Sequence, residues 1–320
     1  MLISQLEYSH GKWSYIKKEE HSSNPLLILL FADRHALSNV APIRDLKNIY
    51  PNASIVSVST SGNFHQTKLA ADDALGATVL ELEKSTFKIQ KLKSADLKNS
   101  EQLHTKITGE FEEENLSHML VFSEGVGVNG STLTYELNHV YEGKVSLTGG
   151  LAGDSFRFQK TLVGLDEDIS EDNIIVIGFY GKNFQVGFGH ACAFESFGPL
   201  RKITKSKDNV LFEIDDKPAL SLYAEYLGKH AEHLPASALW FPLEISNKNK
   251  EQKFVRTILS IDHASNSMTF AGNMPEGSYI RLMQSSTHDI LASAEDSALD
   301  SHEDLGADDG FALVVSCVGR

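Results

Sequence analysis

The most apolar stretch of the sequence is the run Pro-Leu-Leu-Ile-Leu-Leu-Phe-Ala at residues 25–32. A helix that crosses a membrane needs about 20 apolar residues, so this run is far too short to span a bilayer. A continuous apolar run without polar alternation is typical of a strand that is covered on both faces of its sheet. The sequence therefore predicts a buried central strand at this position.

The segments after this run alternate between strand and helix patterns. Apolar side chains spaced by three predict a helix over residues 36–50, and residues 54–59 predict the next strand. The alternation continues with strands at 77–92, 119–123 and 144–148 and helices at 97–116 and 132–141. This order predicts an N-terminal domain over residues 1–153 in which strands and helices alternate, with some parallel pairing.

The second half of the sequence has a different pattern. Short strands are separated by Gly, Asp and Asn, and one helix is expected over residues 219–233, with Pro218 in its first turn. The expected strands lie at 161–165, 173–180, 184–194, 202–205, 209–215, 254–263, 267–270, 279–283 and 311–317. Residues 154–320 therefore predict a mainly antiparallel sheet domain with few helices, and the fold class of the whole chain is α/β, or mixed α+β.

The charge balance argues against two classes of partner. A formal net charge of −14 repels the phosphates of nucleic acids and the surface of anionic membranes. The densest basic stretch, at residues 200–207, has four positive charges but only Phe197 as an aromatic neighbour. We interpret it as a solvated strand surface, and we expect neither nucleic-acid binding nor membrane binding.

The location of the protein is indicated by its N-terminus and its cysteines. Residues 1–20 lack the basic start and apolar run of a signal peptide. The two cysteines, Cys192 and Cys317, have no partner at metal-ligand spacing, which suits a reducing compartment. These features predict a soluble cytoplasmic protein.

A glycine motif at residues 125–130, Gly-Val-Gly-Val-Asn-Gly, matches the pattern of dinucleotide-binding loops. That mechanism also needs an acid at the end of the next strand, but this strand ends in Gly149-Gly150, and the next acid is Asp154. We therefore expect a loop that leads into a helix capped by Asn129 or Ser131.

The turn after the strand at 54–59 is the first candidate for a ligand site. It contains Ser59, Thr60, Ser61 and Gly62, and ligands of α/β sheets bind at the carboxyl ends of strands. A polar turn that lines a ligand is the favoured interpretation, and a structural turn is the alternative.

A second candidate is Asp154, which ends a run of small residues at 149–153. Its carboxylate could bind an amine or hydroxyl of a ligand, or it could cap its own turn. A hydrolase would have to use Ser59, Thr60 and Asp154, with His65 nearby. No paired acid and base and no G-x-S-x-G turn accompany them, so we expect no enzymatic activity.

The segment at 184–194 places bulky and small residues in alternation. As a strand, it would put Phe184, Val186, Phe188 and His190 on one face and glycine or alanine on the other. A single histidine among aromatic residues could ligate haem iron. The alternative is a core histidine bonded to the backbone, with a helix packed on the bare face, and patterning alone favours this alternative.

Several motifs together resemble the FIST family of bacterial signal-transduction proteins over roughly residues 25–320. In the first half the similar segments are Leu-Leu-Ile-Leu-Leu-Phe-Ala, Ser-Ile-Val-Ser-Val-Ser-Thr-Ser-Gly-Asn-Phe and residues 124–137. The more specific segments are residues 149–164, 196–228, 234–243, 272–283 and 312–320. The resemblance implies a module that senses a small ligand.

The segment Gly-Pro-Leu-Arg-Lys-Ile-Thr-Lys-Ser at 198–206 is similar to one branch of the family. That branch binds haem and senses nitric oxide for a histidine kinase or a cyclic-di-GMP enzyme. The resemblance implies that His190 is the axial ligand of a haem b, with Phe184, Val186 and Phe188 around it, and that the signal passes to a separate protein. The alternatives are a receptor for a small metabolite such as an amino acid and, third, a hydrolase.

The sequence departs from the family pattern in two places. The N-terminal turn of the family usually reads Gly-Cys-(Ser/Thr)-Thr-Ala-Gly-Glu-Ile, whereas residues 57–64 lack its cysteine and its acid. The ligand is therefore open. Members also usually continue past Cys-x-Gly-Arg, so the second domain is expected to be truncated at its C-terminus or to come from a shorter member.

Overall fold

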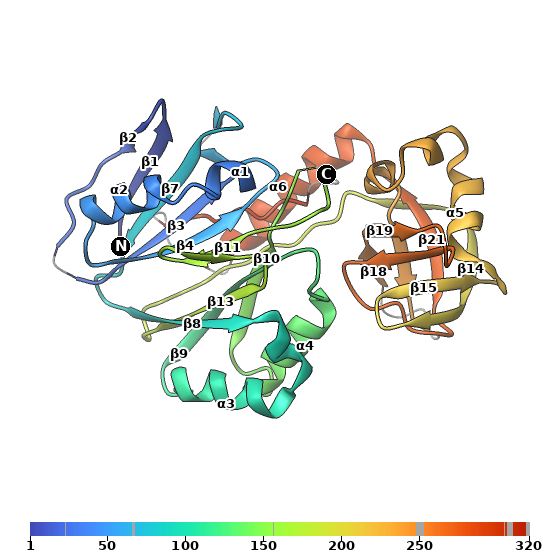
Figure 1. Cartoon of the computed structure of the whole chain (residues 1–320). Coiled ribbons are helices and arrows are strands. Elements are labelled where there is room, and N and C mark those ends of the chain that lie inside the picture. Colours follow the sequence, from blue (N-terminus) through green and yellow to red (C-terminus); the bar gives the residue numbers. More distant parts are fainter. Residues whose placement is uncertain are drawn as a thin grey trace. The chain divides into compact units, whose positions relative to one another are not determined.

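The computed structural model describes residues 1–22, 24–65, 68–155, 157–247, 253–303, 305 and 310–317. These residues form two compact units (Figure 1). The first unit draws on Met1–Val128, Thr134–Val186 and Ala307–Val315, and the second on Asn129–Leu133, Gly187–Gly306 and Ser316–Arg320. The predicted mixed α+β class is confirmed.

The larger sheet of the first unit has the strand order β12-β11-β4-β3-β7-β1-β2. Its strands are β1 (Leu2–Ser9), β2 (Lys12–Lys17), β3 (Leu26–Ala32), β4 (Ala53–Ser59), β7 (Leu75–Glu81), β11 (Val163–Leu165) and β12 (Asp168–Ser170). The predicted central strand is confirmed, because β3 pairs with β4 in parallel and with β7 antiparallel.

A second sheet lies against the first one. Its strands are β8 (Thr86–Lys93), β9 (Leu116–Ser123), β10 (Ser146–Leu151) and β13 (Asn173–Tyr180), in the order β10-β9-β13-β8. Leu27 and Leu29 of β3 share one core with Leu120 of β9 and with Ile175 and Ile177 of β13. The two sheets therefore pack face to face.

Helices cover the outer faces of both sheets. Ile28 and Leu30 of β3 point the other way, into a core with residues of α1 (Arg34–Leu37) and α2 (Ala41–Ile49). On the second sheet, α3 (Ser100–Glu110) is followed by the buried Phe111, whose ring lies over Gly178 of β13. The layers are helix, sheet, sheet and helix (Figure 1), so β3 is apolar at every position because both of its faces are buried.

The second unit contains one eight-stranded sheet with the order β18-β17-β21-β14-β15-β20-β19, and β16 pairs with β15. Its strands are β14 (Glu195–Lys207), β15 (Val210–Ile214), β16 (Lys217–Pro218), β17 (Leu243–Ser246), β18 (Lys253–Arg256), β19 (Ile258–Asp262), β20 (Ser267–Phe270) and β21 (Tyr279–Gln284). The buried side chains of Leu220 and Tyr223, on α5 (Ala219–Leu227), belong to one core with this sheet.

The remaining elements are short or peripheral. They are β5 (Phe64–His65), β6 (Lys68–Leu69), α4 (Gly130–Val140), α6 (Thr287–Glu303) and the 3-10 turns Ser94–Lys98, Gly228–His233 and Ala236–Trp240. The expected helix over 36–50 is divided into α1 and α2, with Pro42 in the first turn of α2, where its missing N–H is tolerated.

The first unit extends further along the chain than the change of pattern near Gly153. Strand β11 pairs with β4, and β13 pairs with β8 and β9. These strands complete the two sheets of the first unit, and this unit continues to Val186.

Two strand predictions were wrong. Residues 184–194 form no strand, because the positions of Gly187 and Gly189 lie against the backbone carbonyls of Ser301 and Ser297 on α6. Residues 311–317 form no strand either. Phe311 and Leu313 pack against the core between the two sheets without pairing, and Val314 and Val315 are exposed.

No helix in the described part of the chain has both the length and the apolar character that a membrane crossing requires.

The core between the sheets gives a first prediction. Leu29 is 1% exposed, so Leu29→Ala would leave a cavity and lower the free energy of unfolding by about 2–5 kcal/mol. Urea denaturation followed by circular dichroism measures this loss. The matched control is Leu69→Ala, because Leu69 is 79% exposed. Equal effects of the two substitutions would contradict the layered core.

Candidate functional site

The candidate residues of the first unit lie where β3, β4 and β10 end. Asp154 is buried there and accepts hydrogen bonds from Nη1 of Arg34 at 3.2 Å and from Nε of Arg157 at 2.8 Å. The backbone N–H groups of Gln159 and Lys160 donate to Oδ2, the oxygen that also accepts from Arg34, at 3.0 and 3.2 Å. Both carboxylate oxygens therefore have partners, and the carboxylate closes the turn that follows it.

The pKa of Asp154 reflects two opposing effects. Burial alone would raise the pKa of Asp154, but the hydrogen bonds from Arg157, Gln159 and Lys160 and the charge of Arg34 outweigh burial. The pKa of Asp154 lies below its ordinary value as a result. The guanidinium of Arg157 also pairs with Asp33, so the cluster contains two carboxylates and two arginines.

The turn at residues 59–62 lies beside the segment that contains Asp154, and its buried polar group bonds to the protein backbone. The hydroxyl of Ser59 donates to the carbonyl of Gly153 at 2.9 Å and accepts from the N–H of Leu162 at 2.8 Å. Ser59 is fully buried, Thr60 is half-buried, and Ser61 and Gly62 are exposed. In the structure, these predicted residues lie close to Asp154. The hydroxyl of Ser59 already bonds to backbone groups, and the carboxylate of Asp154 already bonds to backbone N–H groups and to two arginines.

The glycine motif is likewise held by protein groups. The N–H groups of Val126 and Gly127 donate to the carboxylate of Glu124 at 2.9 and 3.0 Å. Asn129 caps α4, since its side-chain oxygen accepts from the N–H of Ser131 at 3.0 Å. The predicted loop and cap are confirmed.

A Ser–His–Glu arrangement that the sequence analysis missed joins Ser4 of β1, His21 after β2 and Glu81 of β7. Oγ of Ser4 is 2.9 Å from Nε2 of His21, and Nδ1 of His21 is 3.4 Å from Oε2 of Glu81. Ser4 is 0% exposed, and its hydroxyl also accepts from the N–H of Glu19 at 2.9 Å. A nucleophile must reach its substrate, so this arrangement fastens the segment after β2 to the sheet.

The residues predicted around haem are placed as follows. His190 is exposed, Phe188 is 60% exposed, and Phe184 stacks on Phe179 with ring centroids 4.6 Å apart. Because the segment is not a strand, it lacks the alternation that would put Phe184, Val186, Phe188 and His190 on one face. Haem ligation by His190 is not decided by this difference and stays a prediction. Among the described residues, no three His, Cys, Asp or Glu side chains are grouped to hold a metal ion.

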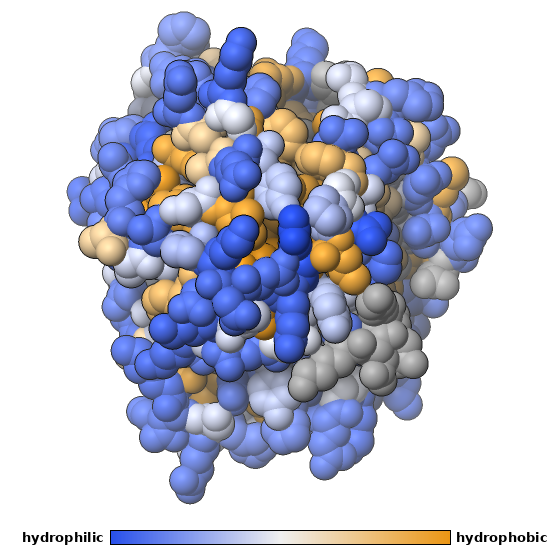
Figure 2. All heavy atoms as spheres, turned by 90° about the vertical axis from the view of Figure 1, so that its right-hand side faces the viewer, coloured by the Kyte–Doolittle hydropathy of each residue, from blue (hydrophilic) through white to orange (hydrophobic). Residues whose placement is uncertain are grey.

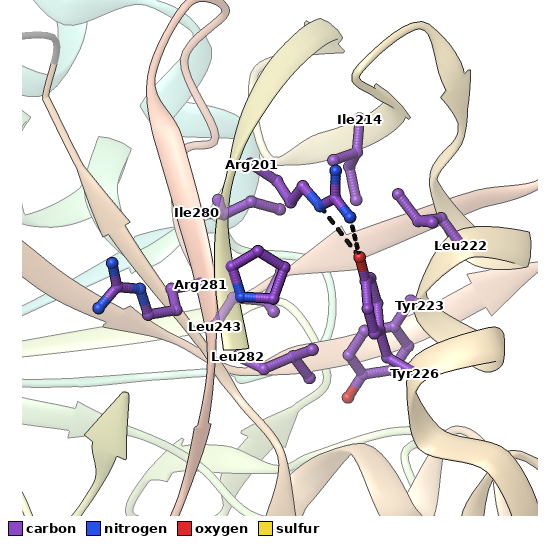
Figure 3. A pocket seen from close by; sticks show the side chains of 10 residues that line it. Arg201, Ile214, Leu222, Tyr223, Tyr226, Leu243, Ile280, Arg281 and Leu282 are labelled. Atoms are coloured by element: carbon purple, nitrogen blue, oxygen red, sulfur yellow. Dashed lines mark hydrogen bonds between the residues drawn. The ribbon is translucent and has the colours of Figure 1, made fainter. Parts of the chain in front are cut away.

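A pocket that the sequence analysis did not predict lies in the second unit, between α5 and the sheet (Figure 3). We call it the α5 pocket. It encloses about 300 Å³, including the space open to solvent. Its lining is Pro199, Arg201, Ile214, Leu222, Tyr223, Tyr226, Leu243, Ile280, Arg281 and Leu282. On the face of this unit that Figure 2 presents, apolar residues gather near the centre, with hydrophilic residues over and around them.

A bulge in β14 accompanies this pocket. Phe197 pairs with Leu282 and Arg201 with Ile280, so three residues of β14 lie opposite one residue of β21. Gly198 adopts a positive φ of 73°, which glycine tolerates best, and Pro199 has no N–H to donate to a ladder. The Gly-Pro element therefore interrupts the strand pairing and puts Pro199 and Arg201 into the pocket lining.

Two polar side chains meet at this pocket from different elements. Arg201 on β14 and Tyr226 on α5 point toward one another (Figure 3). Nε and Nη2 of Arg201 donate to the hydroxyl of Tyr226 at 3.0 and 2.5 Å, and Nη1 donates to Asp215 at 3.0 Å. Asp215 and Asp216 form the tight turn between β15 and β16, with positive φ at both residues.

The fold and the sites define a two-unit α+β protein whose second unit has a pocket with a mainly apolar lining. The FIST N domain matches residues 26–217, and the FIST C domain matches residues 219–320. The chain therefore belongs to the FIST family, whose domains are associated with the sensing of small ligands in signal transduction. No curated protein is significantly similar to the chain.

The cluster around Asp154 gives a prediction on stability and pH. Asp154→Asn removes the buried partner of Arg34, so it should lower the free energy of unfolding at neutral pH by about 3–5 kcal/mol. A folded-state pKa below the unfolded value contributes stability above the unfolded pKa, and this contribution is lost as pH falls through the folded pKa. The variant should therefore lose less stability on acidification than the wild type.

Urea denaturation at a series of pH values measures both effects. Glu167→Gln is the control, because Glu167 pairs with Arg44 on the surface, where such pairs contribute about 0–1 kcal/mol. An Asp154→Asn variant with unchanged acid sensitivity would contradict the role of this carboxylate.

Proposed function

We propose that the protein is a sensor that binds a small ligand in the α5 pocket of its second unit and signals to a separate protein. Membership of the FIST family supports the sensory role. The observation that carries the proposal is the pocket itself, which has an apolar lining and a few converging polar groups, as small-ligand sites have.

The lining supports binding in preference to catalysis. None of the ten lining residues is a carboxylate, a histidine, a serine or a cysteine. Tyrosine can also act as an acid, a base or a nucleophile, but the lining has no carboxylate or histidine that could exchange a proton with Tyr223 or Tyr226. The ligand would therefore leave the pocket unchanged.

The pocket also offers a route for the signal. Leu222, Tyr223 and Tyr226 line it from α5, whereas the other lining residues come from the sheet. A ligand that binds between α5 and the sheet would shift the preferred position of α5. A partner protein that binds α5 would detect this shift. The proposed partner is a cytoplasmic signalling protein such as a histidine kinase or a cyclic-di-GMP enzyme.

Filling the pocket tests the proposal. Purified protein is screened against metabolites by thermal shift, and the affinity of each hit is measured by calorimetry. Leu222→Trp should weaken binding of a hit at least about tenfold, because the indole would occupy the pocket. Leu227→Trp is the control, since Leu227 is also buried on α5 but does not line the pocket. A hit that binds Leu222→Trp as tightly as the wild type would place the ligand elsewhere.

Haem-based sensing of nitric oxide is a narrower form of the sensor proposal, and it rests on the family resemblance alone. It expects a Soret band after reconstitution with haem, a spectral change with nitric oxide, and loss of both in His190→Ala. Absorption spectra that are unchanged by His190→Ala would remove His190 as a ligand and make His65 or His139 the next candidates. No haem uptake would leave the small-metabolite receptor.

A further inference from the structure

We propose that the ligand of the α5 pocket is a small apolar monocarboxylate, and that its carboxylate binds Arg201 in place of the hydroxyl of Tyr226. The inference rests on the proposed function, because it names the chemical class of the molecule that this pocket senses.

The first argument is the geometry at Arg201. Nε and Nη2 form the edge of the guanidinium that binds both oxygens of a carboxylate in parallel hydrogen bonds. Here both groups donate to a single atom, the hydroxyl oxygen of Tyr226. A carboxylate supplies two charged acceptors to the same edge, whereas the tyrosine supplies one neutral acceptor. The hydroxyl thus occupies a position that a carboxylate fits better.

The second argument is the charge already present. Nη1 of Arg201 is paired with Asp215, which fixes the guanidinium and leaves its other edge facing Tyr226. Lys202 is the next residue of the same strand, so its side chain points to the opposite face, and Arg201 is the cation at this edge. One carboxylate is favoured at this edge. The guanidinium of Arg281, the other arginine of the lining, points away from Arg201 and Tyr226 (Figure 3), so a second charge on the ligand would enter the apolar lining without a partner.

The third argument is the lining beyond Arg201. Ile214, Leu222, Leu243, Ile280 and Leu282 are buried apolar residues that line the pocket. They favour a ligand with an apolar body beside its carboxylate. Short aliphatic and phenyl-substituted acids have such a body.

The exchange also explains how binding could be sensed. The Arg201–Tyr226 contact joins α5 to β14, and a carboxylate that takes the arginine edge breaks it. The bound and free states then differ in one defined contact of α5. Such a difference in contacts is what a ligand needs to shift a conformational equilibrium.

Calorimetry with matched probes tests the inference. Hexanoate and phenylacetate are compared with hexanamide and phenylacetamide, which have the same apolar bodies without the charge. The acids should bind at least about tenfold tighter than the amides, because hydrogen bonds to charged groups contribute about 1.5–3 kcal/mol. Arg201→Gln should abolish this preference, and Arg201→Lys should reduce it, since lysine keeps the charge but not the planar edge.

Tyr226→Phe gives the sharpest result. It removes the competing hydroxyl and keeps the ring, so it should tighten acid binding several-fold and leave amide binding unchanged. Tyr226 is 39% exposed, so this variant should fold, and it tests the inference even if Arg201→Gln does not fold.

The outcomes separate the two proposals. Amides that bind as tightly as acids, acids that do not bind at millimolar concentration, or acid binding weakened by Tyr226→Phe would overturn the monocarboxylate inference. Each of these leaves the sensor proposal standing if other hits still depend on Leu222. Binding of every hit that is insensitive to Leu222→Trp would instead overturn the proposed pocket function.

Discussion

Both faces of β3 must be covered, and the order of layers in the first unit follows from this constraint. Leu27 and Leu29 meet the second sheet, while Ile28 and Leu30 meet the helices. A strand that is apolar at every position cannot lie at the surface of a sheet without exposing half of its side chains. The carboxyl end of this strand is therefore held in place from both sides, and the cluster around Arg34 and Asp154 forms just beyond it.

That cluster gives the first unit a different role from the second. Asp154 holds two arginines and two backbone N–H groups, and the hydroxyl of Ser59 bonds the backbone on both sides. A buried carboxylate with every oxygen satisfied stabilises one geometry of the turn, and removing a partner is costly. The α5 pocket is the opposite case, since the edge of Arg201 there is bonded by a neutral hydroxyl, which we propose a ligand replaces. Exchange of a contact is what a sensor requires, and a satisfied buried cluster resists it.

The sequence predicted the elements whose signal is local. The run at β3, the helix α5 after Pro218 and the cap at Asn129 each depend on a few neighbouring residues. The strand expected at 184–194 failed because the same alternation of large and small residues also suits an extended segment whose glycines lie against a helix. For the polar cluster, the sequence placed Ser59 and Asp154 correctly at strand ends. It could not identify Arg34 and Arg157 as their partners, because nothing local marks a long-range ion pair.

The α5 pocket could not be predicted from the sequence for a related reason. Gly198 and Pro199 were visible as a motif, but a bulge depends on how many residues the partner strand supplies, and that partner, β21, lies some eighty positions further along the chain. Only the register of β14 with β21 shows that Arg281 alone faces three residues. The basic stretch at 200–207 shows the same limit. Its charges predicted a solvated strand surface, whereas in the fold one of these residues, Arg201, points toward Tyr226 at the α5 pocket. An arginine edge beside apolar walls favours acids over neutral molecules of the same shape, because the charge is recognised at the mouth while the body is desolvated inside.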